Sequence, residues 1–580
     1  MSAAHGMPGA EEDACDLGAP YEAITNAGRS DPVASAELVL REGWSKRGWP
    51  LVTVGSAPPW EARTPRSFAY ALHAFDMAEP LLRAYDRTRE ARFLDPVLGW
   101  AADWFARCGE PDGPGAEECP FAWYDMAVGM RAYRLAYAFR AGLASSALDS
   151  AGAKAMRDGL TAHFTWLSDD ANVAFHSNHG YYQVAGQLAA GRRLEGFVPG
   201  ARRARRQARR RLLRVVDAQF APDGIHKEHS PDYHRMVLET LRGLLRAGLD
   251  ENGVLARRAD GIEEALAWFV APNGHIVNFG DSDDRDLSME PKKAAERWRH
   301  PAMQWAVSGG RAGQRPEGTA RVFPEGGYYV ARAPSATAPH DPARDSYLAM
   351  TACFHSRTHK QADDLSFVWY EDGQPILIDA GRYGYIDRLP PGDPRRTDGY
   401  WYGDPMRRYV ESTRAHNAIT VDGRNTPRQG VTPYGSAIEG ARLLDDGTHE
   451  VTASIPLHGG RWRRRLAWSP GRQLVVKDTV EGMPDGAAVA QWFQLAEGLV
   501  PEADSSGGLI AALDGGLLHA AFLGGVLRAE SHGVVTPDIR GWWSPTEQVT
   551  HPVWTITGQF SHRQTDALTV FDWVCGREGS

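Results

Sequence analysis

The spacing of apolar residues changes once along the chain, near residue 315. From about residue 66 to residue 310, apolar residues recur three and four positions apart, as in "WYDMAVGMRAYRLAYAFRAGL" (123–143) and "DGIEEALAWFV" (260–270). This is the period of an amphipathic helix, and Gly, Pro and Asp interrupt it at intervals. Since no fixed repeat period is present, the pattern predicts successive helical hairpins, stacked or closed into a ring, without naming a repeat family.

After the polar stretch "SGGRAGQRPEGTARVFPEGG" (308–327), apolar and polar residues alternate instead. "LSFVWYEDGQPILIDAG" (365–381) contains two alternating runs around an Asp-Gly pair, which is a strong hairpin signal. "RRLAWSPGRQLVVKDTV" (464–480) continues in the same way. We therefore predict a flexible N-terminus over residues 1–20, a helical domain over 21–315 and an antiparallel β domain over 316–580.

The length of the chain is consistent with two domains, and its composition excludes several classes of protein. A chain of 580 residues is too long for one ordinary core. A net charge of −9 argues against a dedicated nucleic-acid binder. The N-terminus shows no signal peptide and no apolar run reaches spanning length, so we expect a cytoplasmic protein without a membrane partner, or a secreted or periplasmic one if a leader has been removed. Five cysteines without a CxxC pair indicate neither a disulfide framework nor a thiolate metal site.

The stretch "GARRARRQARRRLLRVV" (200–216) is strongly basic, with eight arginines between residues 202 and 214. It could bind a polyanion, but a solvated outer helix face is the interpretation that the pattern favours. The 19 Trp and 19 Tyr suit a carbohydrate cleft, although core packing accounts for most of them.

Two stretches place polar groups at helix starts in the first half of the chain. In "FHSNHGYYQVAGQL" (175–188), Asn178 and His179 precede an apolar helical stripe, and Asn178 taken alone is interpreted as an N-cap. In "EHSPDYHRMVLETLRGLL" (228–245), Ser230 and Pro231 form a helix start, which places Tyr233 in the first turn. Tyr233 could simply head a core stripe, but its neighbours are unusually titratable.

Two further stretches lie in the β part. "FHSRTHKQADDLSFVWYEDGQPILIDAGRYGY" (354–385) carries His359 before a strand, and Asp379, Arg382 and Tyr385 after the hairpin. "STRAHNAITVDG" (412–423) has further basic and imidazole side chains at a strand start. Groups of His and Asp across strands can hold a metal, and singly they are as well explained as satisfied polar residues.

Together these four stretches, with "PNGHIVNFGDSDD" (272–284), resemble the heparinase II/III-type polysaccharide lyases from about residue 60 to the C-terminal region. The resemblance implies an N-terminal incomplete (α/α) toroid followed by a C-terminal antiparallel β-sandwich. It also implies β-elimination in a polysaccharide that contains uronic acid: a base removes the C5 proton, an acid protonates the leaving oxygen, and donors neutralise the sugar carboxylate.

The resemblance assigns roles to individual residues. Asn178 matches the family's neutraliser, and His179 matches a position used as base or co-neutraliser. Tyr233 matches the catalytic tyrosine, used as acid and in some members also as base, and His359 matches a histidine from the β domain. Which of His179 and Tyr233 is the base stays open. We hold six other residues as substrate contacts: Glu228, His229, His234, Arg382, Tyr385 and Arg414.

The sequence departs from the family at one expected metal ligand. Several members have His-x-His before the "LSF" strand, and the second histidine helps to bind a structural zinc. Here that position is Gln361, while Asp379 and His416 match the other ligands. An amide is a poor zinc ligand. We expect no cofactor for the chemistry, and leave open whether Gln361, Asp379 and His416 hold a divalent metal or are joined by hydrogen bonds alone.

The expected partner is an anionic poly- or oligosaccharide, for which exolytic trimming is favoured, and neither nucleic acid nor membrane. The oligomeric state stays open, a homodimer included. One alternative is an (α/α)-barrel glycoside hydrolase, whose two carboxylates could come from "NFGDSDDRD" (278–286) or Glu228. Another is a polysaccharide-binding protein without catalysis. The binding protein does not explain why Asn178, His179, Tyr233 and His359 occur together, and the products of the reaction distinguish the hydrolase.

Overall fold

The computed structural model describes residues 20–575 apart from residues 23, 25–30, 47–48, 114, 251–252, 336–339, 484–485, 514, 524–525 and 562–565. The predicted flexible N-terminus therefore lies outside the described residues, except for Pro20. Contacts divide the chain into two compact units. The first is Met1–Gln219 with Val237–Ala259, and the second is Phe220–Met236 with Asp260–Ser580.

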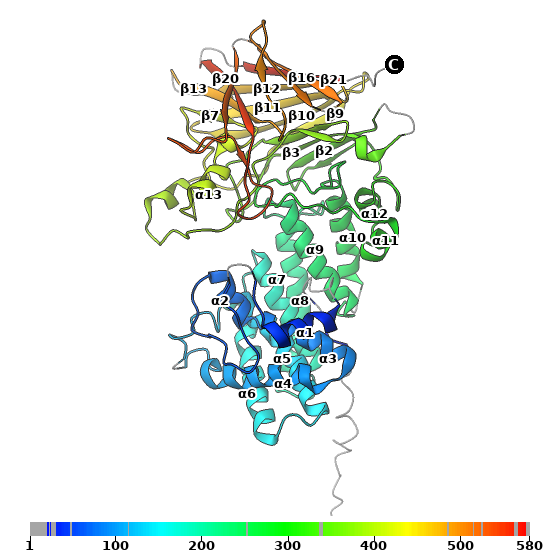
Figure 1. Ribbon diagram of the computed structural model, residues 1–580, viewed down its shortest axis with the longest axis vertical. Coiled ribbons are helices and arrows are strands. Elements are labelled where there is room, and N and C mark those ends of the chain that lie inside the picture. Colours follow the sequence, from blue (N-terminus) through cyan, green and yellow to red (C-terminus); the bar gives the residue numbers. More distant parts are fainter. Residues whose placement is uncertain are drawn as a thin grey trace, which may run out of the picture. The chain divides into compact units, whose positions relative to one another are not determined.

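Helices come first along the chain and strands follow (Figure 1), as the change in apolar spacing predicts. The last helix before the strands ends at Val307 and the first strand begins at Ala320. The compact units follow contacts and divide the chain elsewhere, so the bounds of the two domains stay a prediction. The helices are α1 (Pro32–Glu42), α2 (Arg66–His73), α3 (Glu79–Thr88), α4 (Ala91–Cys108), α5 (Met126–Ala144), α6 (Ser150–Ser168), α7 (Asn178–Arg193), α8 (Ala201–Gln219), α9 (Pro231–Arg246), α10 (Val254–Ala267), α11 (Pro291–Arg297), α12 (Pro301–Val307) and α13 (Pro405–Val410).

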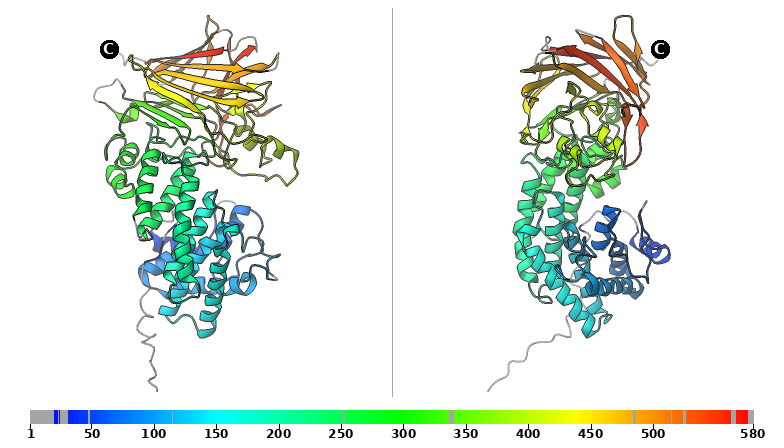
Figure 2. Two further views of the ribbon diagram at one scale, coloured as in Figure 1. Left: turned by 180° about the vertical axis from the view of Figure 1, so that it is seen from behind. Right: turned by 90° about the vertical axis from the view of Figure 1, so that its left-hand side faces the viewer.

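In the first unit, α7 packs against both α5 and α8 (Figure 2). Glycines allow the approach of α5 to α7. A Cβ on Gly186 would lie 1.9 Å from the carbonyl oxygen of Gly129, and a Cβ on Gly129 would lie 2.5 Å from Cα of Gln183. The two backbones therefore touch where α7 begins its second turn and beyond, which fixes the helix whose start carries Asn178 and His179.

The second unit is built on antiparallel sheets. Their orders are β1-β2-β3-β5-β6, β14-β15-β16-β21-β12-β11-β10-β9, β17-β20-β13-β7, β18-β19 and β4-β8. The strands are β1 (Ala320–Phe323), β2 (Tyr328–Ala333), β3 (Ser346–Thr351), β4 (Cys353–Phe354), β5 (Phe367–Glu371), β6 (Gln374–Leu377), β7 (Ile419–Val421), β8 (Gly435–Ser436), β9 (Ile438–Leu443), β10 (His449–Leu457), β11 (Gly460–Ser469), β12 (Gln473–Glu481), β13 (Ala488–Gln494), β14 (Glu502–Ala503), β15 (Leu509–Leu513), β16 (Gly516–Leu523), β17 (Leu527–His532), β18 (Trp542–Trp543), β19 (His551–Pro552), β20 (Trp554–Ser561) and β21 (Asp566–Cys575).

Burial along the strands shows which sheets are covered on both faces. In β11 and β12, buried and more exposed residues alternate, so one face of that sheet packs inward. Strands β2, β3 and β5 are buried at every position, which shows that their sheet is covered on both faces. One apolar core, including Trp369, Trp462 and Phe571, joins these strands.

The predicted hairpin at residues 365–381 is present as β5 and β6. Glu371 pairs with Gln374, and the two residues between them have positive φ, 51° at Asp372 and 75° at Gly373. That conformation is the one that a two-residue turn needs. A Cβ at Gly373 would also lie 1.9 Å from the carbonyl oxygen of Ala343, so this position requires glycine. Among the described residues, no helix is long and apolar enough to cross a membrane.

Candidate active site

The first candidate group opens helix α7 in the first unit. The residue that caps this helix is Ser177, whose side chain accepts a hydrogen bond from the backbone N–H of His179 at 3.2 Å. The interpretation of Asn178 as the N-cap is therefore wrong by one residue. Asn178 is the first residue inside the helix and is only 6% exposed. Because Ser177 supplies the cap, the Asn178 side chain is not needed for capping.

Asp125 fixes the orientation of His179. Its Oδ2 lies 2.6 Å from Nδ1 of His179, so the carboxylate accepts the Nδ1 proton and Nε2 carries the lone pair. Asp125 directly precedes α5 and has a left-handed φ of 56°. The His179 side chain is 33% exposed, which leaves it open to a ligand. An imidazole held in this tautomer can act as a base through Nε2.

The loop ahead of α7 is held by side-chain amides. Gln183 accepts from the backbone N–H of Ala174 at 3.0 Å and donates to the carbonyl of Asn172 at 2.6 Å. Gln219 donates to the carbonyl of Ser177 at 2.6 Å. A Cβ at Gly180 would lie 2.2 Å from the carbonyl oxygen of Ala174, so the Asn-His-Gly motif needs its glycine for this close contact.

The second candidate group surrounds Tyr233 in the second unit. Ser230 accepts from the backbone N–H of Tyr233 at 3.2 Å, which is the predicted cap. The Ser230 hydroxyl also lies 2.8 Å from that of Ser282, which in turn donates to the carbonyl of Phe279. The start of α9 is thus tied to the 279–282 loop, and this places Tyr233 in the first turn of the helix.

Tyr233, His359 and Tyr385 form a compact cluster. The rings of Tyr233 and His359 are stacked, with centroids 4.0 Å apart and planes inclined by 27°. The Tyr385 hydroxyl lies 2.9 Å from the Tyr233 hydroxyl, 2.8 Å from Nδ1 of His359 and 3.0 Å from Oδ2 of Asp281. Tyr385 donates to the carboxylate, so its oxygen accepts the proton of Tyr233. The hydroxyl of Tyr385, which is expected as a substrate contact, is bonded to these protein groups.

Asp281 is the centre of this cluster. Its Oδ2 accepts from Nδ1 of His359 at 2.9 Å as well as from Tyr385, and its Oδ1 accepts from Arg407 at 2.7 Å and Gln361 at 2.9 Å. Burial alone would raise the pKa of Asp281, but Arg407 and the hydrogen bonds from His359 and Gln361 bring it below its usual range. The carboxylate therefore stays ionised and holds His359 with Nε2 as the basic nitrogen.

Burial raises the pKa of Tyr233 above that of a free tyrosine. The Arg382 guanidinium and the hydrogen bond with Tyr385 act in the opposite direction without cancelling this effect. The pKa of Tyr385 is also raised, again chiefly by burial. Tyr233 is therefore protonated at neutral pH and is equipped to donate a proton, which is the form that a general acid requires.

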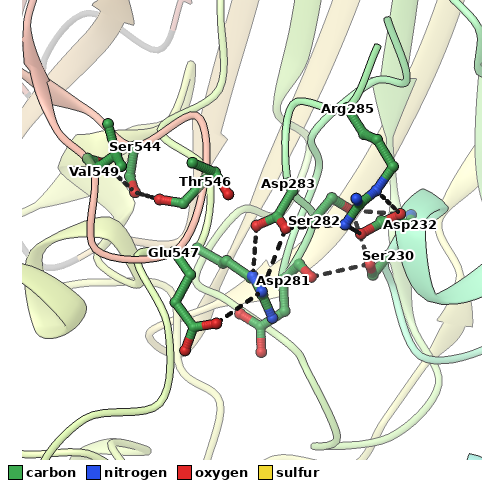
Figure 3. A network of polar contacts seen from close by, with 12 residues as sticks. Ser230, Asp232, Asp281, Ser282, Asp283, Arg285, Ser544, Thr546, Glu547 and Val549 are labelled. Carbon is green, nitrogen blue, oxygen red and sulfur yellow. Dashed lines mark hydrogen bonds and ion pairs between the residues drawn. The ribbon is translucent and has the colours of Figure 1, made fainter. Parts of the chain in front are cut away.

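Arg382, another expected substrate contact, is held by ion pairs to a network of which Figure 3 labels Asp283, Arg285 and Glu547. Its Nε lies 2.7 Å from Oδ1 of Asp283, and its Nη2 lies 3.6 Å from Glu547. Asp283 also pairs with Arg285 at 3.1 Å, and Arg285 pairs with Asp232 beside the Ser230 cap. This chain of ion pairs fixes the loop that carries Asp281 against the start of α9.

The remaining expected substrate contacts lie in different surroundings. His229 is buried, donates from Nδ1 to the carbonyl of Thr358 and accepts at Nε2 from the N–H of His355. His234 is buried and bonds the carbonyl of Ile262 at 2.8 Å, and burial lowers its pKa to about 4. Because both histidines bond the protein backbone, we do not carry them into the proposed site.

Two expected contacts remain to be placed. Glu228 is buried, and its Oε2 lies 3.6 Å from Nε2 of His359, so it borders the cluster. Arg414 pairs at the surface with Asp538 at 3.5 Å, and in the described part of the chain no hydrogen bond or ion pair joins it to Tyr233 or His359.

The three expected metal ligands lie close together but do not fit zinc. His416 donates from Nδ1 to Asp379 at 2.9 Å, while Gln361 donates to Asp281 and to the carbonyl of Gly381 at 3.2 Å. Two buried atoms without a hydrogen-bond partner remain, Nε2 of His416 and Oε1 of Gln361. The described residues contain no group of three or more His, Cys, Asp or Glu side chains able to hold a metal ion. An imidazole, an amide oxygen and the Asp379 carboxylate, which already accepts from His416, fall short of the four ligands of a structural zinc site, so no chemical step is assigned to a metal.

Three groups of this site were missed as positioning residues. Asp125 stands just before a predicted helix in "WYDMAV", and Asp281 stands in "NFGDSDD", for which the only predicted role is as a source of hydrolase carboxylates. Arg407 has no signal in the sequence beyond its charge. A carboxylate placed ahead of a helix start was the one available hint for Asp125.

Comparison with known proteins agrees with the motifs. Residues 32–300 match the model of the heparinase II/III N-terminus, and residues 315–569 match the model of the heparinase II/III-like C-terminal domain. The chain belongs to the heparinase II/III family. This confirms the predicted family, its class as a polysaccharide lyase and its fold class, an (α/α) toroid followed by an antiparallel β-sandwich. Among curated proteins, no sequence matches this family member.

Solved structures of similar fold cover nearly the whole chain. A crystal structure of heparinase III has a TM-score of 0.73 and 17% identity over 96% of this chain and 86% of that chain. Heparan sulfate lyase HepC from Pedobacter heparinus has a TM-score of 0.70 and 17% identity over 97% and 86%. A chondroitinase AC lyase has a TM-score of 0.53 and 11% identity over 96% and 82%. At such low sequence identities, the structural similarity supports only the fold of this heparinase II/III family member.

Proposed function

We propose that this heparinase II/III family member cleaves a uronate-containing glycosaminoglycan by β-elimination. The observation that carries the proposal is the cluster of Tyr233, His359 and Tyr385 on an ionised Asp281. A protonated tyrosine beside an oriented imidazole is what elimination needs and hydrolysis does not. Similarity in fold to heparan sulfate and chondroitin lyases supports a glycosaminoglycan as the substrate class.

The reaction moves one proton off the sugar and one onto it. A base removes the C5 proton, the electron pair forms the C4–C5 double bond, and the C4–O bond breaks. Tyr233 is the acid in this scheme, since its raised pKa keeps it protonated until the leaving oxygen takes the proton. His179, oriented by Asp125, is the base. Asn178 neutralises the carboxylate, in the role that the family motif implies.

A glycoside hydrolase is a poorer explanation of the same side chains. Its acid must be a carboxyl group whose pKa is raised. The pKa of Asp281 is lowered, not raised, by Arg407, His359 and Gln361. Asp283 is paired with Arg382 and Arg285. These carboxylates therefore hold other groups in place rather than donate protons.

Ultraviolet absorbance during incubation with heparan sulfate, hyaluronan, chondroitin and alginate tests the proposal. The unsaturated uronate of a lyase product absorbs, and a hydrolysis product does not. We expect absorbance to rise during incubation with one of the glycosaminoglycans. In Tyr233→Phe, the rate of this increase should be about 10²–10⁴-fold lower. Tyr383→Phe, two residues from Tyr385, is the matched control and keeps the activity. New reducing ends without absorbance would overturn the proposal.

A further inference from the structure

Helix α8 carries an arginine stripe that the proposed chemistry does not use. The stripe consists of the exposed residues Arg202, Arg203, Arg206, Arg210 and Arg214. At 100° per residue they share an arc of about 120°, and the buried residues of α8, such as Ala204, Ala208, Leu212 and Val215, lie on the opposite side. From its first to its last member the stripe extends about 18 Å along the helix axis.

The stripe is poorly neutralised by the protein itself. Arg202 pairs with Glu195 at 3.4 Å and Arg214 with Asp170 at 3.3 Å, and both carboxylates are shared with other arginines. Within the described ranges, Arg203, Arg206 and Arg210 form no ion pair. Three exposed guanidinium groups are therefore left without a carboxylate on a chain of net charge −9.

The spacing of the arginines opposes helix stability. Arg202 and Arg206, Arg206 and Arg210, and Arg210 and Arg214 each stand four residues apart, where like charges face each other and repel. Opposite charges at the same spacing would have stabilised the helix instead. The repulsion is relieved when an anion lies along the stripe.

We infer that the arginine stripe of α8 binds an anionic polysaccharide, outside the residues that carry the chemistry. Guanidinium groups pair with carboxylate and sulfate in a planar, two-bond geometry, and a row of them suits a linear chain with regularly spaced anions. The inference rests on the proposed function for the choice of a polysaccharide. The net negative charge of the protein disfavours nucleic acid as the ligand, because nucleic acid has a higher density of negative charge than a polysaccharide and is repelled more strongly.

The test compares a triple variant with a matched one in the full-length chain. Arg203→Ala, Arg206→Ala and Arg210→Ala together remove the unpaired stripe and keep a good helix former at each position. Arg157→Ala, Arg472→Ala and Arg528→Ala remove the same number of exposed charges elsewhere. Binding to immobilised heparan sulfate chains is measured at several salt concentrations, on a Tyr233→Phe background that prevents turnover. Cleavage of long chains and of a tetrasaccharide is measured with Tyr233 intact.

We expect the stripe variant to bind long chains at least about tenfold more weakly, with a shallower dependence on salt, and the control to bind as the parent does. Cleavage of the tetrasaccharide stays unchanged. The inference is overturned if the stripe variant binds as the parent does, or if duplex DNA competes as well as heparan sulfate. Should the chain cleave nothing while the stripe still governs binding, the proposed function fails and the inference stands.

Discussion

Tyr233 and His359 lie face to face, with ring centroids 4.0 Å apart, although they are 126 residues apart in the sequence. The imidazole covers one face of the phenol, so a sugar can reach Tyr233 only from its other face or along its hydroxyl edge. Both side chains are bonded to Tyr385, and His359 is bonded to Asp281. The pair is therefore positioned by protein groups through Tyr385 and Asp281.

The pH dependence of cleavage distinguishes an acid from a base at Tyr233. Because burial raises the pKa of Tyr233, its phenol stays protonated up to at least about pH 10. If it is the acid, kcat/KM shows no rise from its ionisation between pH 7 and about 10. If tyrosinate is the base, kcat/KM rises about tenfold per pH unit over that range. A profile measured by ultraviolet absorbance decides between them, and a steady rise would assign the base to Tyr233.

Replacement of Asp281 tests its positioning of His359. Asp281→Asn keeps the shape of the side chain but offers an NH₂ group where His359, Tyr385 or Arg407 donates. We expect kcat to fall by about 10²-fold with KM changed less than about threefold, because orientation is lost rather than binding. Asp286→Asn, at an exposed carboxylate of the same loop, is the control. Equal losses in kcat and in substrate affinity would show that Asp281 touches the sugar instead.

The carboxylate of Asp281 should also contribute to the dependence of the free energy of unfolding on acidic pH. The pKa of Asp281 is lowered in the folded state, so its contribution to the free energy of unfolding is present above about pH 4 and is lost as the pH falls below it. We expect Asp281→Asn to unfold with a shallower dependence on pH below about pH 4. Denaturant titrations at several acidic pH values measure the slope, and an unchanged slope would refute the assignment.

Asp125 is expected to set the tautomer of His179. In Asp125→Asn the side-chain amide can donate to Nδ1, which moves the imidazole proton to Nε2 and removes the base. We expect a fall in kcat of about 10²-fold or more with little change in thermal stability. Asp158→Asn, at an exposed carboxylate on α6, leaves kcat as it is. If kcat survives in Asp125→Asn, His179 is not the base.

A methyl group at Gly180 should displace the Asn-His segment. Its Cβ would lie 2.2 Å from a backbone oxygen of Ala174, which cannot move as a flexible side chain does. We expect Gly180→Ala to lower the free energy of unfolding by about 1–3 kcal/mol and to reduce cleavage. Gly99→Ala, in α4, meets no atom within 4 Å and should stabilise the protein by about 0.5–1 kcal/mol. Thermal unfolding and activity of the two variants provide the comparison.

Metal removal should leave the protein unchanged. Gln361 uses its amide group to bond Asp281 and Gly381, and the remaining donors are too few for zinc. We expect a chelator to alter neither the melting temperature nor kcat, and elemental analysis to find less than one zinc per chain. A melting temperature that falls with chelator and recovers with zinc would show that a metal is held after all.

Local chemistry made parts of this structure predictable from the sequence. The turn at Asp372 and Gly373 and the cap at Ser230 depend on a few adjacent residues, and both are present as predicted. Helices α1 and α13 carry the same kind of signal, since Asp31 and Asp404 cap them ahead of a proline. The apolar spacing does not mark either helix, because α1 lies before residue 66, where that spacing begins, and α13 lies in the β part.

The site itself depends on distant residues, which limits what a single sequence reveals. The partners of Asp281 come from separate segments, at His359, Gln361, Tyr385 and Arg407. No spacing in the sequence indicates that these meet. Residue type is equally silent about burial: His229 and His359 stand in similar polar stretches, yet the ring nitrogens of His229 are both bonded to backbone atoms.

The group of side chains bonded to Asp281 also determines how the effects of several substitutions combine. One carboxylate oxygen receives both His359 and Tyr385, and the other receives Arg407 and Gln361, so a single loss releases several partners together. The effects of substitutions within this group on kcat should therefore not be additive in free energy. Once a first substitution has freed the cluster, a second one adds little further loss. Sequence change among relatives would then be tolerated within this group only as a set, never one residue at a time.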